Sequence, residues 1–245
     1  FASFFRPARQ VSGDFYDIFE LSEGNMGLVI ADVCGKGVGA ALFMALFRSL
    51  IRIFSGQTSL EGVELPGKTE MVECIASENC DADYHRALEA VSLTNKYIVQ
   101  NHGDLSMFAT LFFGVLDTAS GKLSYINAGH DSALVIGPQG VKQRLEPSGP
   151  VVGALPEAIY LPRHIVIDSG DILLAFTDGV TDSRSPGDEL FGHQRLHQLF
   201  DGTFHTANDL VKKIQQELAT FIGQSPQEDD ITLLAVHRKK CPTKC

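Results

Sequence analysis

The spacing of apolar residues changes several times along the chain, and each change predicts the end of one element and the start of another. Residues 25–33 (NMGLVIADV) form a short apolar run, which predicts a buried strand. After the glycines of CGKGVG, residues 38–54 are apolar on most faces, so a helix covered on more than one side is expected there. A second helix is predicted over residues 84–101, with Gly103 close to its C-terminal end.

From residue 107 onward, strand patterns dominate. Residues 107–117 and 122–129 alternate in polarity on either side of the turn TASG and predict a β-hairpin. The further elements predicted are a strand at 133–137, a second hairpin-like unit at 159–177, helices at about 189–199 and at 207–222 (the latter after an N-cap at Thr206), and a closing strand at 231–238. Mostly antiparallel strands with grouped helices predict a layered α+β sandwich.

Length and charge narrow the class of protein. The chain has 245 residues, 44% of them hydrophobic, which is enough to bury a core without disulfide bonds and fits a single domain over residues 1–245. Residues 55–83 are acidic and rich in turn residues, and we expect them to form an insertion or flap within that domain. The 20 Lys and Arg against 30 Asp and Glu give a net charge of −10, which disfavours a nucleic-acid-binding surface because phosphates need a basic face.

The cellular setting is indicated by three features. No run of 18 apolar residues occurs, so a membrane-spanning helix is not expected. The five cysteines are an odd number scattered through a large domain, which favours a reduced, cytoplasmic protein over a disulfide framework. The chain begins FASFFRPARQ, without Met, so we expect it to be one domain of a longer protein.

Four aspartates stand where apolar runs begin or end: Asp14, Asp32, Asp178 and Asp229. Each alone is typical of a turn or a cap. Four at strand ends in one acidic chain indicate a cation site instead, because buried carboxylates repel one another and hard cations compensate them. Two divalent ions would balance the four charges, and the absence of a His/Cys cluster favours Mg²⁺ or Mn²⁺ over Zn²⁺.

Neighbouring residues leave alternatives open. Cys34 invites a thiol mechanism, but CGKGVGA lacks the arginine that ends a cysteine-phosphatase loop, which favours a structural cysteine. The same glycines lack the spacing of a nucleotide-binding loop. Lys36 is either solvated or attracts a substrate phosphate. His130 either donates a proton to a leaving group or fixes a turn.

Several motifs occur in one order along nearly the whole chain, roughly residues 5–238, interrupted by the insertion. They are GDFYD, DVCGKGVGAALFMA, FATLFFGVLD, INAGH, PSGPVVG, GDILLAFTDGVTD and EDDIT. Together they resemble the SpoIIE-like (RsbU-like) branch of the metal-dependent, type 2C serine/threonine phosphatases. The turn after His130 departs from that pattern, since Asp131 and Ser132 stand where prolines are usual.

The resemblance implies a four-layer α-β-β-α sandwich, two mostly antiparallel sheets flanked by helices, with a two-metal site at one end. By matching motifs, Asp14 would bind the second metal, and Asp32 would bridge both ions with the Val33 carbonyl completing the shell. Asp178 and Asp229 would hold the first metal. A further pair, Asp17 and Asp230, are second candidates or outer-shell groups.

The implied function is hydrolysis of phosphoserine or phosphothreonine on a protein partner by a water activated by two Mg²⁺ or Mn²⁺ ions. The resemblance points to a phosphorylated anti-sigma-factor antagonist as that partner. The start of the chain without Met suggests an upstream sensor or receiver domain, for which this domain would be the output module. A homodimer is one state that such a domain could adopt. The alternative is a catalytically inactive module that binds a phosphoprotein, against which the four intact aspartates argue. A two-metal nuclease conflicts with the net charge of −10.

Overall fold

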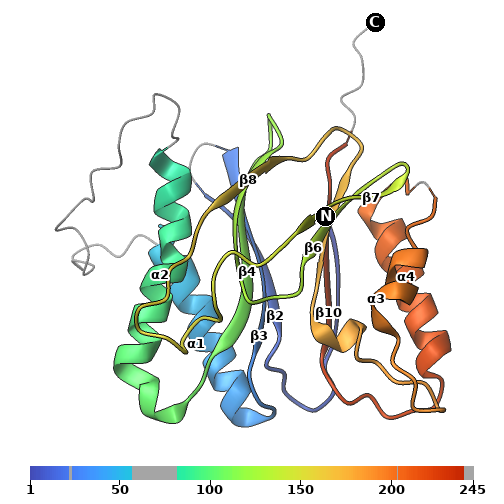
Figure 1. Cartoon of the computed structure of the whole chain (residues 1–245), viewed down its shortest axis with the longest axis horizontal. Helices are drawn as coiled ribbons and strands as arrows, with labels where there is room; N and C mark the ends of the chain where they lie inside the picture. Colours follow the sequence, from blue (N-terminus) through green and yellow to red (C-terminus); the bar gives the residue numbers. More distant parts are fainter. Residues whose placement is uncertain (22–23, 57–81, 203, 240–245) are drawn as a thin grey trace, which may run out of the picture.

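The computed structural model describes residues 1–21, 24–56, 82–202 and 204–239. In this part of the chain, ten strands form two five-stranded sheets that face each other, and helices cover the outer face of each sheet (Figure 1). This is the four-layer α+β sandwich that the motifs imply.

Each sheet is built from antiparallel pairs of strands. The first sheet contains, in spatial order, β1 (Ala2–Arg6), β10 (Ile231–His237), β9 (Ile172–Phe176), β6 (Ala133–Gly137) and β7 (Gly140–Leu145). The second contains β2 (Phe15–Glu20), β3 (Asn25–Val33), β4 (Ala109–Asp117), β5 (Lys122–Ala128) and β8 (Arg163–Val166).

The helices divide between the two outer faces. Helices α1 (Val38–Phe54) and α2 (Ala82–His102) pack on the second sheet, and α3 (Gly192–Gln198) and α4 (Ala207–Ile222) pack on the first (Figure 1). Two short 3₁₀ turns complete the fold, η2 (Gly103–Leu105) and η3 (Asp178–Val180).

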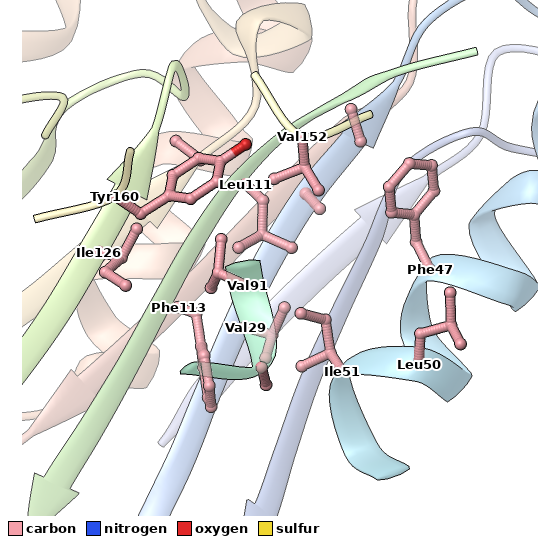
Figure 2. Close-up of a cluster of buried hydrophobic side chains, with 14 of the residues drawn as sticks. Val29, Phe47, Leu50, Ile51, Val91, Leu111, Phe113, Ile126, Val152 and Tyr160 are labelled. Carbon is pink, nitrogen blue, oxygen red and sulfur yellow. The ribbon is translucent and has the colours of Figure 1, made fainter. Parts of the chain in front are cut away.

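Three apolar layers hold these elements together. In the layer under α1 and α2, Phe47 and Ile51 of α1 meet Val29 of β3 and Phe113 of β4 (Figure 2). Each such buried side chain contributes about 1.5–3 kcal/mol. A second layer lies between α4 and the first sheet, and a third lies between the two sheets. Strand β3 therefore faces apolar layers on both sides, which explains its continuous apolar run.

Several sequence predictions are confirmed. The strand at 25–33 and the helix at 38–54 have the predicted bounds. Helix α4 begins after its predicted N-cap, because the Thr206 side chain accepts a hydrogen bond from the Asp209 backbone N–H at 3.1 Å. The helix predicted at 84–101 is longer, Ala82–His102, and the one predicted at 189–199 is shorter, Gly192–Gln198.

The hairpin predicted over residues 159–177 is wrong. Strand β8 pairs with β5 at the edge of the second sheet, whereas β9 pairs with β10 and β6 in the first. The Ser169–Asp171 turn, with Gly170 at a φ of 99°, carries the chain from one sheet to the other. The sequence marks this turn but not the partner of each strand, and the mostly exposed β8 contrasts with the fully buried β9.

Three strands escaped prediction: β1, β2 and β7. Strands β1 and β7 are edge strands, and β7 carries exposed Lys142, Gln143 and Arg144 that hide its strand pattern. Strand β2 alternates regularly between more and less buried positions, but it contains Asp17 and Glu20.

The predicted insertion lies almost entirely outside the described residues, since α1 ends next to Ser55 and α2 begins at Ala82. Of the five cysteines, only Cys34 falls within the described part, and its thiol is free. No helix in the described ranges is long and apolar enough to cross a membrane.

Candidate metal centre

The topology brings the four strand-end aspartates to one end of the sandwich, the lower end in Figure 1. Asp14 precedes β2 and Asp32 lies at the end of β3, and these strands are antiparallel neighbours. Asp178 follows β9 and Asp229 precedes β10, and these strands are antiparallel neighbours in the facing sheet. In each sheet, the start of one strand therefore lies beside the end of its antiparallel neighbour, and each of these places carries two of the four aspartates.

Asp14 forms the floor of the site between the sheets, where it is only 3% exposed. Its Oδ2 accepts hydrogen bonds from the Thr177 hydroxyl at 2.7 Å and the Thr232 hydroxyl at 2.6 Å, both from the facing sheet. Burial and the nearby charge of Asp32 raise the pKa of Asp14 strongly, although the two threonine bonds oppose that rise. Without a cation, this carboxyl is favoured in its protonated form.

Asp32 is half-buried, and the adjoining Val33 is fully buried at the end of β3. Burial raises the pKa of Asp32, followed by the charges of Asp178 and Asp229, while a hydrogen bond with the Asp14 side chain lowers it. Gly13 lies against this strand end, and a Cβ atom there would come within 2.8 Å of the Val33 carbonyl oxygen. The glycine of the SGD motif is therefore needed for close packing against a predicted ligand.

Asp178 begins η3 and lies exposed at the rim of the site, while Val180 in the same turn is fully buried. Partial burial raises the pKa of Asp178 to about 6, with further contributions from Asp229, Asp182 and Asp131. The following Gly179 is required by packing, because a Cβ atom there would overlap the Asp230 carbonyl oxygen.

Asp229 stands on the opposite rim and forms an ion pair that the sequence did not suggest. The Lys36 Nζ lies 2.8 Å from Asp229 Oδ2 and donates a hydrogen bond to the Glu228 carbonyl at 2.6 Å. Beside this pair lies a hollow of about 170 Å³, lined also by Gly179, Asp182 and Arg184.

The two second candidates, Asp17 and Asp230, are engaged elsewhere. Asp17 accepts hydrogen bonds from Arg52 at 2.5 and 2.7 Å and from Arg48 at 3.0 Å, which fastens β2 to α1. Asp230 accepts from the Ala8 N–H at 2.7 Å and from the Ser12 hydroxyl at 2.7 Å and the Gly13 N–H at 3.0 Å. Asp17 thus supports the fold, whereas Asp230 also contributes to the raised pKa of Asp14 and Asp32, which keeps it as a candidate outer-shell group. The four strand-end aspartates and the Val33 carbonyl stay the proposed ligands.

His130 is 3% exposed and fixes the turn between β5 and β6. Its Nδ1 lies 2.8 Å from the Thr110 hydroxyl, and the backbone N–H of His130 donates to Asn127 Oδ1 at 2.8 Å. Burial lowers its pKa to about 4, so the ring is neutral at pH 7. This geometry favours the turn-fixing alternative over the proton donor.

Two carboxylates beyond the predicted set also act on the centre. Asp131 and Asp182 lie close enough to raise the pKa of Asp178. The sequence shows Asp182 in the acidic motif TDGVTD and Asp131 in the turn that follows β5, but neither was predicted to act on the site.

The donor chemistry fits hard divalent cations, because the centre offers carboxylate oxygens whose pKa values are raised by burial first and by neighbouring carboxylates second. Within the described residues, no group of three or more His, Cys, Asp or Glu side chains is placed so that it could hold a metal ion. Mg²⁺ is usually bound through one or two protein carboxylates and several waters, so it is the ion that needs the fewest side chains.

Comparison with known proteins places this arrangement in a family. The family described as Stage II sporulation protein E (SpoIIE) matches residues 22–239. The chain belongs to the SpoIIE family. The match spans every element from β3 onward and agrees with the order of the motifs along the chain.

Relatives of this SpoIIE domain are longer proteins. Protein IcfG of Synechocystis sp. is 48% identical over 244 residues, which cover 96% of this chain and 37% of IcfG. Phosphoserine phosphatase RsbU of Bacillus subtilis is 26% identical over 95% of this chain and 61% of its own length. The chain thus spans between about a third and three-fifths of these two relatives. Among solved structures, the SiaA-PP2C domain of Pseudomonas aeruginosa has the same fold, with a TM-score of 0.72 at 20% identity over 96% of this chain and 85% of that one.

Proposed function

We propose that this SpoIIE domain hydrolyses phosphoserine or phosphothreonine on a protein partner with the help of two divalent cations, Mg²⁺ or Mn²⁺. One observation carries the proposal. Asp14, Asp32, Asp178 and Asp229 come from four strand ends in two facing sheets, and the first three have raised pKa values through burial and mutual repulsion. Such crowding works against folding unless cations compensate it, which is unexpected for ordinary turn aspartates.

The proposed ligands differ in burial: Asp14 is buried, Asp32 and Asp229 are half-buried, and Asp178 is exposed. Asp14 would bind one metal ion, Asp178 and Asp229 would bind the other, and Asp32 with the Val33 carbonyl would contribute to both. When bound, two divalent ions would lower the pKa of a water between them and neutralise charge on the phosphoryl oxygens. The exposed rim and the adjoining hollow leave room for waters and for the phosphate to approach. No protein nucleophile is required, so Cys34 need not react.

The threonine bonds to Asp14 would orient its carboxylate. The hydroxyls of Thr177 and Thr232 both donate to Oδ2, so neither of these bonds uses Oδ1. A ligand held in this way is oriented before the ion arrives, as neighbouring groups commonly orient metal-binding side chains.

The substrate is proposed from the relatives. RsbU is named a phosphoserine phosphatase, which supports phosphoserine on a protein as the substrate. We propose a small phosphorylated partner, an anti-sigma-factor antagonist, and a cytoplasmic location. We further propose that the domain is the output module of a longer signalling protein with an upstream sensor or receiver domain, in line with relatives of which it spans 37% and 61%.

The test measures phosphate release from a phosphoserine peptide with Mn²⁺ and with EDTA, for the wild type, Asp32→Asn and Asp229→Asn. We expect activity only with metal and a loss of more than tenfold in kcat for each variant, equivalent to more than about 1.4 kcal/mol of barrier. Asp201→Asn, at an exposed position outside the centre, is the matched control and should keep full activity. Metal-independent hydrolysis, or a variant with more than a tenth of wild-type kcat, would refute the two-metal assignment. Mn²⁺ binding without any turnover would favour the inactive phosphoprotein-binding module instead.

A further inference from the structure

The ion pair between Lys36 and Asp229 places a cation of the protein itself at the rim of the proposed metal centre. Lys36 Nζ lies 2.8 Å from Asp229 Oδ2, and the same ammonium is held by the Glu228 carbonyl at 2.6 Å. This salt bridge ends on one of the four strand-end aspartates that we propose as metal ligands. The side chains are 38% and 40% exposed, so both can exchange partners without unfolding their surroundings.

The backbone fixes where this lysine stands. Lys36 lies between Gly35 and Gly37, which have φ values of 84° and 87°, a conformation that disfavours other residues. Helix α1 begins directly after this turn, and Cys34 before it is fastened to β4 by its N–H, which donates to the Phe108 carbonyl at 2.9 Å. The turn is therefore held by the Cys34 backbone bond on one side and by helix α1 on the other, and it places Lys36 beside the loop that carries Asp229.

An ammonium and a divalent ion bound to one carboxylate repel each other and draw on the same negative charge, so pairing with one weakens the binding of the other. Asp229 also interacts electrostatically with Asp32 and Asp178, so the lysine lies within the field of the whole cluster. Lys36 thus supplies part of the positive charge that the metal would otherwise supply.

We propose that Lys36 is a built-in competitor of the metal at Asp229: its ammonium pairs with this carboxylate in the metal-free domain and must be displaced before the ion is bound there. This inference rests on the proposed metal centre. It assigns Lys36 a role in setting metal affinity, which is distinct from both the solvated lysine and the phosphate-attracting lysine that the sequence left open.

The experiment measures Mn²⁺ affinity by calorimetry on metal-free protein. Lys36→Met keeps the length of the side chain and removes the charge, so we expect Mn²⁺ to bind about threefold to tenfold more tightly, the range that an exposed ion pair and its repulsion of the ion would produce. Lys36→Arg retains a cation and should stay within about twofold of wild type. The matched control is Lys212→Met, which removes the same charge from an exposed position on α4 and should also leave affinity unchanged.

A double-mutant cycle isolates the pair. In an Asp229→Asn background, the carboxylate for which Lys36 and the metal compete is absent, so Lys36→Met should change Mn²⁺ affinity by less than about twofold. Equal or weaker Mn²⁺ binding by Lys36→Met than by wild type would overturn the competitor role while leaving the metal centre in place. Failure of Mn²⁺ to bind wild type and every variant would overturn the metal centre itself, and the competitor role with it.

Discussion

If the strand-end carboxylates form a metal centre, metal binding and stability must be linked, and Asp178→Asn separates the two contributions. The substitution removes one negative charge from the rim while nearly preserving the shape of the side chain. Without metal it should relieve repulsion from Asp229, Asp182 and Asp131 and stabilise the domain. With metal it should remove a ligand and reduce the stabilisation that the ion provides.

The magnitudes follow from the structure. Raising the pKa of Asp178 from 3.8 to about 6 corresponds to about 3 kcal/mol for a buried group. Because Asp178 is exposed, solvent screening leaves about 1 kcal/mol. This penalty grows as the pH rises from 3.8 to about 6 and is complete above the raised pKa, so at pH 7.5 Asp178→Asn in EDTA should melt about 2–4 °C above wild type. Below pH 3.8, where both side chains are neutral, the difference should vanish.

The response to metal has the opposite sign. At a hundred times its Kd, one ion that binds only the native state adds about 2.7 kcal/mol, which raises the melting temperature of a domain of this size by about 5–10 °C. Wild type should show this rise, and Asp178→Asn should show less than half of it.

The assay is a set of thermal melts of wild type, Asp178→Asn and the control Asp201→Asn, each in EDTA and in Mn²⁺. Asp201 is exposed and outside the centre, so its variant should follow wild type in both conditions. An equal Mn²⁺ response in wild type and Asp178→Asn would show that Asp178 is not a ligand. A destabilised Asp178→Asn in EDTA would contradict the repulsion that the raised pKa implies.

Two further predictions concern groups that support the centre. Asp17→Asn should lower the free energy of unfolding by about 2 kcal/mol, because it breaks charge-assisted bonds from Arg52 and Arg48. Burial disfavours the charged form of Asp17, but the bonds from Arg52 and Arg48 outweigh burial and lower the Asp17 pKa below 3.8. The stability difference between wild type and Asp17→Asn should therefore be constant above pH 3.8 and shrink as the pH falls through the lowered pKa. Urea unfolding between about pH 2 and 7 measures this difference, and a difference that does not change with pH would contradict the argument. Gly179→Ala should destabilise the domain by about 1–3 kcal/mol and weaken Mn²⁺ binding, because the added Cβ would overlap the Asp230 carbonyl. The control is Gly187→Ala, whose Cβ would meet nothing closer than 3.7 Å and which should leave the melting temperature unchanged. Equal melting temperatures of the two variants would refute the packing argument.

Local patterns in the sequence predicted local structure well. Strand β3 and helix α1 have the predicted bounds. The strand is buried on both faces and so forms a continuous apolar run, and the helix is a long apolar stretch that begins after a cluster of glycines. The hairpin at 159–177 failed because strand pairing depends on contacts between distant segments, and β8 and β9 find their partners in different sheets.

The same division holds at the centre. The four strand-end aspartates were predicted because each borders an apolar run, and the antiparallel pairing brings them to one end. The roles of Asp17 and Asp230 could not be predicted, because each depends on a partner more than 30 residues away: Arg48 and Arg52 for the first, Ala8 and Gly13 for the second. The Lys36–Asp229 pair likewise joins loops separated by most of the chain.

The adjoining Asp229 and Asp230 have consequences for comparing diverged copies of this domain. Asp230 holds the segment from Ala8 to Gly13 against the start of β10, whereas Asp229 faces the rim and bonds Lys36. A copy that has replaced the residue at position 229 but kept Asp230 should still fold and would be a natural binding-only descendant. A copy that has replaced the residue at position 230 must have acquired another anchor for its N-terminal segment. Comparing positions 229 and 230 separately therefore distinguishes the loss of a proposed metal ligand from a change in how the N-terminal segment is held. A simple count of the retained acidic residues would not separate these two cases.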